Sequence, residues 1–295
     1  MDRDLWRKLM SSVKRAARAL PKPRRRPKFP DWLIVAMYLW CVWHDRPLSW
    51  GCDRSHYGAL FRPRKLPSVS QFSRRVRGER FTLIMQRVHE DLAGWCVPTA
   101  LSYLDGKPLP VGAASHDRQA RVGKVSGGFA RGYKLHGWVT EDRRIPVWSL
   151  QPLNVGEPLV AWAMLPHLPP LPQGRALVLA DGNYDDKDLH KELDAGGARL
   201  LAPPRGYAEH AVTLRQMGPA RREALAVWRD HAPLAEHVHH HRLNVEVTFS
   251  NLCSFGGGLA PLPAWVRGKE RVTRWVGAKI IIYHARLATR KAAAA

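Results

Sequence analysis

The segment ALVLADGNYDD, residues 176–186, decides the fold of this chain. Its unbroken apolar run predicts a strand buried on both faces, and turn-forming residues follow directly after Asp181. A second segment, LSYLDGKPLPV at residues 101–111, has the same form, with an apolar run that closes on Asp105 before a glycine. Each segment is therefore predicted to be a buried strand that ends near a carboxylate.

Strand and helix patterns alternate on both sides of these two segments. A glycine-rich, basic stretch at residues 123–132 leads into a predicted hairpin, and a short apolar helix follows it. After Asp181 come a short helix, another strand and a last helix that carries Glu246. The predicted elements are, in order, a strand at 101–111, a hairpin of 132–140 and 144–152 with its turn at 141–143, a helix at 156–168, a strand at 176–181, a helix at 185–193, a strand at 198–205 and the helix around 246.

This order of elements predicts an α/β domain with a ribonuclease H-like fold over residues 99–290. In that fold the first strand is central and lies beside the strand that follows the first helix. Asp105 and Asp181 are then expected to lie together, although 76 positions separate them. Residues 206–236 interrupt the scheme and are interpreted as an insertion, helical around residues 221–228.

The first third of the chain is basic and is predicted to bind DNA. Residues 1–30 are interpreted as an extended or partly helical arm, and residues 31–98 as a small helical region with helices at 31–43, 68–77 and 81–93. The helix at 68–77 resembles a recognition helix, although a solvated basic face gives the same pattern. The candidate DNA-binding residues here are Arg24, Arg25, Arg26, Arg74 and Arg75.

The composition points to a polyanionic partner. The 295 residues carry 47 Lys and Arg against 25 Asp and Glu, a net charge of +22. Residues 1–80 hold 20 of these bases and 6 of the acids, a net of +14, so the excess is concentrated at the amino end. The four cysteines show no metal-binding spacing, and the longest apolar run, residues 33–43, is shorter than the ~20 residues of a membrane span. We expect a cytoplasmic, nucleoid-associated protein with no membrane partner.

Three carboxylates form the candidate catalytic site: Asp105, Asp181 and Glu246. Two strand-end carboxylates and one helical carboxylate can hold two divalent metal ions for phosphoryl transfer. Each aspartate alone could simply end a strand, since Asp-Gly is a common turn dipeptide. Arg242 lies four residues before Glu246, on the same face of a helix, where it could orient Glu246, contact DNA phosphate or form an ordinary ion pair. The histidines of HVHHHR, residues 237–242, could also bind metal, but neutral packed imidazoles are the commoner case.

With these residues placed, the chain resembles the DDE transposases of bacterial insertion sequences, of the broad IS4/IS5 type. The segments that carry the resemblance are YLDGKPLPV, RGYKLHGWVT, LADGNYDD and HRLNVEVTF, in that order. These transposases also share a pattern of Tyr, two residues, Arg, three residues, Glu, six residues, Lys. Arg242 and Glu246 match that pattern, whereas His239 and Cys253 occupy the Tyr and Lys positions, which in the family contact the transposon end.

The resemblance implies a mechanism and partners. Two Mg²⁺ or Mn²⁺ ions held by Asp105, Asp181 and Glu246 would serve cleavage at the element's terminal inverted repeats and then strand transfer to target DNA. Carboxylate oxygens are the ligands that such cations prefer. Synapsis of two ends implies a homodimer bound to double-stranded DNA. Two other readings stay open: a structure-selective nuclease or resolvase on the same fold, and a DNA-binding protein without catalysis.

Overall fold

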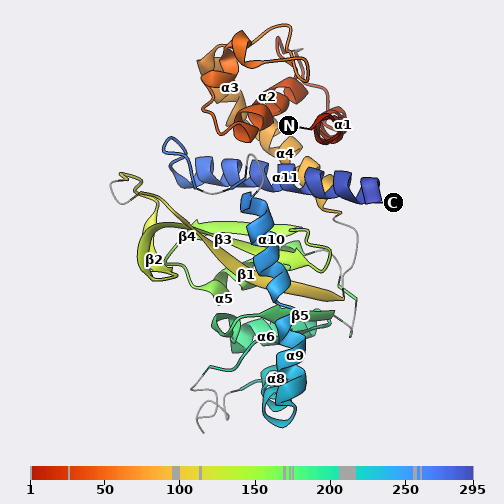
Figure 1. Ribbon diagram of the computed structural model, residues 1–295, viewed down its shortest axis with the longest axis vertical. Helices are drawn as coiled ribbons and strands as arrows, with labels where there is room; N and C mark the ends of the chain where they lie inside the picture. Colours follow the sequence, from red (N-terminus) through yellow and green to blue (C-terminus); the bar gives the residue numbers. More distant parts are fainter. Residues whose placement is uncertain are drawn as a thin grey trace. The chain divides into compact units, whose positions relative to one another are not determined.

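The computed structural model consists of two compact units (Figure 1). It describes residues 2–25, 27–94, 100–112, 115–168, 171–172, 174, 176–205, 217–254, 258–259 and 261–294, with side chains as far as residue 290. Residues 1–95 and 252–295 form the helical unit, and residues 96–251 form the sheet unit. No described helix is both long enough and apolar enough to cross a membrane.

The helical unit begins with a packed helix, α1 (Arg3–Arg18), where the sequence predicted an arm. Leu5, Leu9 and Val13 recur at helical spacing and are buried, and α1 packs against α2, α4 and α11. The prediction was wrong on this point because the many bases of α1 lie on its exposed face and obscure an apolar stripe on the other.

The other three amino-terminal helices follow the sequence prediction. They are α2 (Asp31–Trp43), α3 (Val69–Val76) and α4 (Glu79–Ala93), with two single turns, η1 (Trp50–Cys52) and η2 (Arg54–His56), between α2 and α3. Ser68 caps α3 in a complete capping box with Gln71. Asp31 is the first residue of α2, after Pro30.

A long helix at the end of the chain, α11 (Lys269–Ala294), completes the helical unit. It packs on α1, α2 and α4, and its apolar residues Ile280, Ile281 and Ile282 are buried. This differs from the predicted domain limits, which assigned these residues to the ribonuclease H-like domain. The pattern of α11 shows an apolar helix but does not show which apolar surface receives it.

The sheet unit is built on one six-stranded sheet with β1 at its centre (Figure 1). The strands pair in the order β2-β3-β1-β5-β6, and β4 pairs with β3. The β1–β5 and β5–β6 pairs are parallel and the others antiparallel, so the predicted ribonuclease H-like order is confirmed. The strands are β1 (Leu101–Pro110), β2 (Arg121–Val125), β3 (Gly128–Thr140), β4 (Val147–Pro152), β5 (Ala176–Ala180) and β6 (Ala198–Leu201).

Strand β2 was missed in the sequence because its segment was interpreted as a glycine-rich loop. Gly127 and Gly128 have φ angles of +82° and +146°, which turn the chain tightly between β2 and β3. The glycines that made this segment look irregular in the sequence therefore close a hairpin.

Helices flank the strands and include most of the predicted insertion. They are α5 (Glu157–Met164), η3 (Leu165–His167), η4 (Gly182–Tyr184), α6 (Lys187–Ala195), α8 (Pro219–Asp230), α9 (Ala232–His240) and α10 (Leu243–Ser254). Residues 206–216 of the insertion lie outside the described residues. The helix predicted around residues 221–228 is α8, and α9 leads directly from it to α10, which carries Glu246.

Candidate functional site

The register of two parallel strands sets Asp105 and Asp181 at the same level of the sheet. Leu104 of β1 pairs with Ala180 of β5, and each aspartate is the next residue along its chain. Asp181 follows the end of β5, as predicted. Asp105 does not end its strand, because β1 continues to Pro110 in its antiparallel pairing with β3. What ends at Asp105 is the contact with β5, so the carboxylate lies where the two strands part.

Two glycines make room around Asp105. Gly137 faces Asp105 across the β1–β3 pair, and a Cβ atom there would lie 3.2 Å from the ring of Phe249 on α10. A Cβ atom on Gly106 would lie 2.7 Å from the Lys134 side chain. The glycine after Asp105 is therefore a packing requirement, whereas the sequence suggested a turn.

Helix α10 is fixed against the sheet beside these aspartates. Phe249 and Val245 are buried, and the Asn244 amide donates to the Tyr103 hydroxyl at 3.0 Å. Glu246 projects from the same helix with about half of its side chain exposed. The helical carboxylate is thus near the strand carboxylates but held less tightly than they are.

Arg242 joins the helical and strand carboxylates. One of its terminal nitrogens lies 3.2 Å from Asp105 Oδ2, and the other lies 3.1 Å from Glu246 Oε1. The guanidinium is one-fifth exposed. The intrahelical Arg242–Glu246 pair predicted from spacing is present, and the same arginine also reaches a residue 137 positions away.

A fourth carboxylate, which the sequence did not indicate, borders the site. Glu157, the first residue of α5, is mostly buried and binds Lys134 Nζ at 2.5 Å through Oε1. Burial raises the pKa of Asp105 to about 6; Arg242 and the Gly106 amide oppose the rise, and Asp181 and Glu157 add to it. The aspartate therefore stands in a concentration of negative charge that Arg242 only partly offsets.

Two buried polar atoms point to unused binding capacity beside Asp105. Glu157 Oε2 and the Tyr184 hydroxyl are buried and have no hydrogen-bond partner within the described residues. Burial raises the pKa of Tyr184 well above its ordinary value, and Glu157, Asp105 and Asp181 raise it further. The Tyr184 side chain is fully buried near the Glu157, Asp105 and Asp181 carboxylates.

The turn that follows Asp181 is clamped by arginines from later in the chain. Asp181 accepts from the Asn183 amide at 2.9 Å, and the Arg205 side chain donates to the carbonyls of Gly182 and Asn183. Asp185 is buried and receives two hydrogen bonds of 2.7 Å from Arg221 of α8. The next residue, Asp186, is the N-cap of α6.

The donor chemistry of the site fits a hard divalent cation. Asp105, Asp181 and Glu246 offer carboxylate oxygens, and the Arg242 guanidinium already places positive charge between two of them. As the described residues stand, no three His, Cys, Asp or Glu side chains converge enough to hold an ion together. Arg242 contacts one carboxylate oxygen of Asp105 and one of Glu246.

The histidines before Arg242 do not form a metal cluster in the described part of the chain. His239 Nε2 lies 2.8 Å from the carbonyl oxygen of Ala180, the residue before Asp181, and its ring packs edge-on against Trp228. Where the transposase pattern has tyrosine, His239 thus supports the end of β5. Cys253 lies in the last turn of α10 and is half-buried.

The arginines proposed to bind DNA differ in their surroundings. Arg24, Arg25 and Arg74 are exposed, and Arg26 lies outside the described residues. Arg75 is paired with Asp31 at 2.5 Å and donates to the Phe29 carbonyl at 3.0 Å. Arg75 is therefore occupied within the helical unit, whereas Arg74 points to solvent.

A solved structure and a family model are similar to the chain. The solved structure of a piggyBac transposase synaptic complex with hairpin DNA is similar to the chain, with 9% identity and a TM-score of 0.49 over 99% of this chain and 74% of that one. No curated protein sequence matched the chain. A family model described as a transposase DDE domain matches residues 100–283, which cover the three carboxylates, the central sheet and most of α11. The chain belongs to the family of DDE transposases.

Proposed function

We propose that the chain is the transposase of a bacterial insertion sequence of the IS4/IS5 type, and that Asp105, Asp181 and Glu246 are its catalytic carboxylates. The observation that carries this proposal is the Arg242 bridge, which ties Glu246 to Asp105 beside Asp181. The substrate is double-stranded DNA that bears the terminal inverted repeats of the element. The net charge of +22 supports a partner of this kind.

The carboxylates divide into fixed and adjustable groups. Sheet register fixes Asp105 and Asp181, and the Arg205 and Arg221 clamps hold the turn behind Asp181. Bound by the three carboxylates, Mg²⁺ or Mn²⁺ supplies activation of the attacking oxygen and stabilisation of the leaving oxygen. Arg242 neutralises Asp105 and Glu246 until then, and afterwards it is free to pair with a DNA phosphate through its planar guanidinium. Cleavage of two element ends in one complex requires a homodimer.

The test is cleavage and strand transfer on DNA that carries the native element ends, in the presence of Mg²⁺. Asp105→Asn should lower the cleavage rate by more than the roughly 100-fold expected from loss of an outer-shell partner, while DNA affinity stays within about twofold. Asp188→Asn is the matched control, because Asp188 is an exposed aspartate on α6 that should leave the rate unchanged. Wild-type cleavage by Asp105→Asn would show that the carboxylates are assigned wrongly.

A second reading, DNA binding without catalysis, draws support from one observation. The carboxylates of the described residues do not converge, and Arg242 is paired with two of them. Binding of Mn²⁺, measured by calorimetry, separates the two readings. A catalytic site should bind the ion in the wild type and weaken on Asp105→Asn, whereas a silent binder should show no Mn²⁺ uptake and no DNA product. Cleavage of branched DNA regardless of the repeat sequence would instead favour a structure-selective nuclease.

A further inference from the structure

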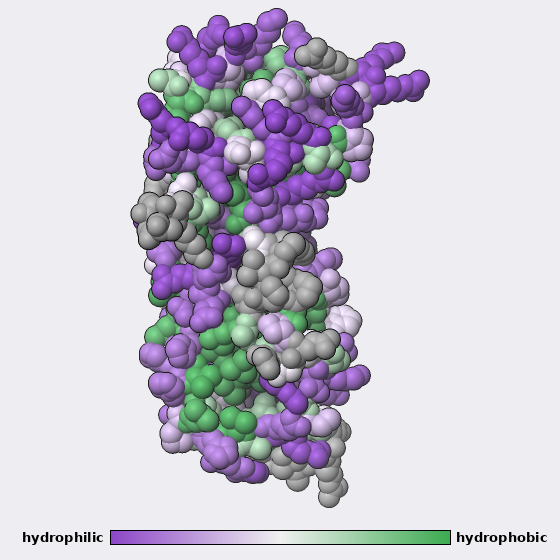
Figure 2. Space-filling view, turned by 90° about the vertical axis from the view of Figure 1, so that its right-hand side faces the viewer, coloured by the Kyte–Doolittle hydropathy of each residue, from purple (hydrophilic) through white to green (hydrophobic). Residues whose placement is uncertain are grey.

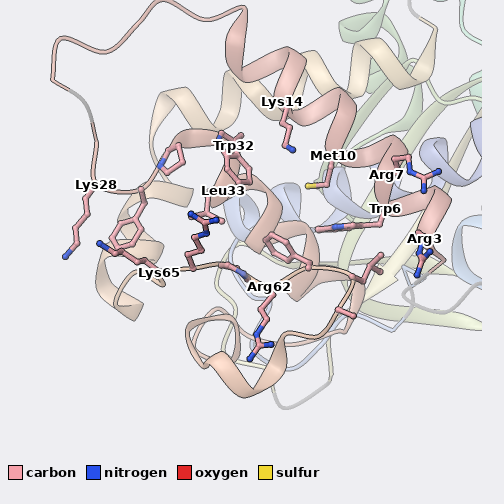
Figure 3. A pocket seen from close by; sticks show the side chains of 17 residues that line it. Arg3, Trp6, Arg7, Met10, Lys14, Lys28, Trp32, Leu33, Arg62 and Lys65 are labelled. Carbon is pink, nitrogen blue, oxygen red and sulfur yellow. The ribbon is translucent and has the colours of Figure 1, made fainter.

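The helical unit contains a pocket of about 1100 Å³. The residues that line it lie between positions 3 and 65 and include none of the candidate catalytic carboxylates. Its walls are α1, the segment that leads into α2, and residues 59–65 (Figure 3). Figure 2 shows hydrophilic side chains over most of the visible surface of this unit, at the top of the view. The pocket therefore belongs to a unit whose surface is strongly polar.

The lining of the pocket carries seven cationic side chains and no acidic one. All seven are exposed, and Arg7 is the one with an ion pair among the described residues, to the exposed Asp4. Six positive charges are left without an acidic partner within the described part of the chain, which favours an anionic ligand with several charges. The seven residues are Arg3, Arg7, Lys14, Lys28, Arg62, Arg64 and Lys65.

The floor of the same pocket is aromatic and apolar. Trp6 and Phe61 pack against each other with ring centroids 4.9 Å apart and are mostly buried. Trp32 is only half-buried, and Lys14 Nζ lies 5.4 Å from the centroid of its ring. In Figure 3 the Trp32 ring and the Met10 side chain lie beneath α1, with Arg62 and Lys65 on the facing segment. Trp32 is thus the aromatic ring with a surface open to a ligand.

We propose that this pocket binds a single-stranded stretch of DNA, with phosphates on its cationic rim and a base stacked on Trp32. A duplex offers its phosphates to such a rim but keeps its bases stacked inside, so it leaves the apolar floor unused. A single strand offers both charge and flat apolar rings, the combination that single-strand binding sites accept through cations and aromatic side chains. The inference rests on the proposed function only for the source of the strand, which is unpaired DNA at an element end.

The test is binding of a fluorescein-labelled oligothymidine of about 15 nucleotides to the full-length protein, measured by anisotropy across a salt series. Trp32→Leu keeps an apolar side chain but removes the stacking ring, and it should weaken binding roughly tenfold or more. Trp32→Phe should stay within about threefold of the wild type, because a ring remains. The double variant Arg62→Ala/Lys65→Ala should reduce the slope of log K against log salt by about 1.4, since each phosphate contact on a single strand contributes about 0.7.

Lys8→Ala/Arg87→Ala is the matched control for charge. Both residues are exposed in the helical unit, and neither lines the pocket. The proposal would be overturned if the slope of log K against log salt fell equally in the control and in the pocket variant. It would also be overturned if Trp32→Leu weakened duplex binding and oligothymidine binding equally. Displacement of the oligothymidine by poly-glutamate of matched charge, at similar concentration, would show a site for acidic polymers in general and would also overturn it.

The cleavage assay with Asp105→Asn fails or succeeds independently of these measurements. If the pocket variants lost oligothymidine binding but the wild type cleaved no DNA, the proposed single-strand site would stand and the proposed transposase reaction would be wrong. Thermal melting of each variant near the wild-type temperature ensures that a loss of binding reports the pocket rather than the fold.

Discussion

The two units of this chain place their charges in opposite ways. The sheet unit buries ion pairs close to its candidate catalytic carboxylates, namely Asp185 with Arg221, Glu157 with Lys134, and Asp105 with Arg242. The helical unit has an apolar and aromatic core and keeps its cations outside, around the pocket lined by α1. Among the described residues of this unit, Lys279 is a fully buried lysine, and it pairs with Asp45.

The buried ion pairs and the exposed cations have different physical roles, which are to position side chains and to attract a charged partner. A buried ion pair stabilises a fold weakly at best, because the cost of desolvating two charges offsets their attraction. Three such pairs around one end of a sheet are therefore explained by the need to hold carboxylates in place. Exposed cations cost little and act over about 10 Å at ordinary salt, which suits the first contact with a polyanion.

The largest effect is expected from a change at Asp185, which tests the role of the buried ion pairs in the sheet unit. Asp185→Asn leaves the buried Arg221 guanidinium without its charge partner, and it should lower the free energy of unfolding of the sheet unit by about 3–5 kcal/mol. Urea unfolding gives the total change, and hydrogen exchange locates it in the peptides of residues 176–240. The control Asp230→Asn breaks an exposed pair with Arg229 and should leave stability nearly unchanged. A similar loss in both variants would mean that the Arg221 clamp holds nothing in place.

Acid should weaken the sheet unit through the same residue. Burial disfavours the charge of Asp185, but hydrogen bonds from His190, Arg221 and the Arg205 amide outweigh it and hold the pKa of Asp185 well below its ordinary value. A carboxylate with a depressed folded pKa contributes its full stability above the unfolded pKa of about 3.9, and loses it as the pH falls below that value. Melting temperature from pH 6 to pH 2 should therefore fall in the wild type and fall less steeply in Asp185→Asn. Parallel curves would show that other acids control the transition.

In the helical unit, the corresponding change is at Lys279. Its Nζ donates to the Val42 carbonyl at 2.8 Å and to Asp45 at 2.6 Å, where α2 ends. Lys279→Met fills the same space but removes both of these hydrogen bonds, and it should cost about 1–3 kcal/mol. Arg290→Met, an exposed change on the same helix, should stay within about 0.5 kcal/mol. The contrast between the units would weaken if Lys279→Met unfolded the sheet unit first in hydrogen exchange.

Local patterns predicted the elements wherever one physical signal dominated. The apolar runs at residues 101–104 and 176–180 became β1 and β5, and topology then brought Asp105 and Asp181 together. The four-residue spacing of Arg242 and Glu246 gave their ion pair. Local patterns failed where two structures share one pattern. The bases of α1 concealed its buried apolar stripe. Gly106 looked like a turn residue, although it makes room for the Lys134 side chain.

The supporting residues of the site were beyond the reach of sequence patterns. Arg205 and Arg221 hold the turn after Asp181 from 20 to 36 positions beyond Asp185, and no spacing rule links them to it. Glu157 begins an ordinary apolar helix, so its sequence context suggests a helix start and nothing more. A carboxylate's role can be predicted from its element, whereas its neighbours depend on how the elements pack.

The smallest effect concerns a helix cap, and it tests whether the helical unit depends on local structure as well as on its core. Ser68 Oγ accepts from the Gln71 amide at 3.3 Å, and Gln71 Oε1 accepts from the Ser68 amide at 3.1 Å. Ser68→Ala removes one half of this box and should cost about 1 kcal/mol. Ser73→Ala lies within α3, where alanine favours the helix, so stability should hold or rise slightly. Equal results for the two variants would mean that packing of Phe72 and Val76 fixes α3 by itself, and that the unit rests on its apolar core alone.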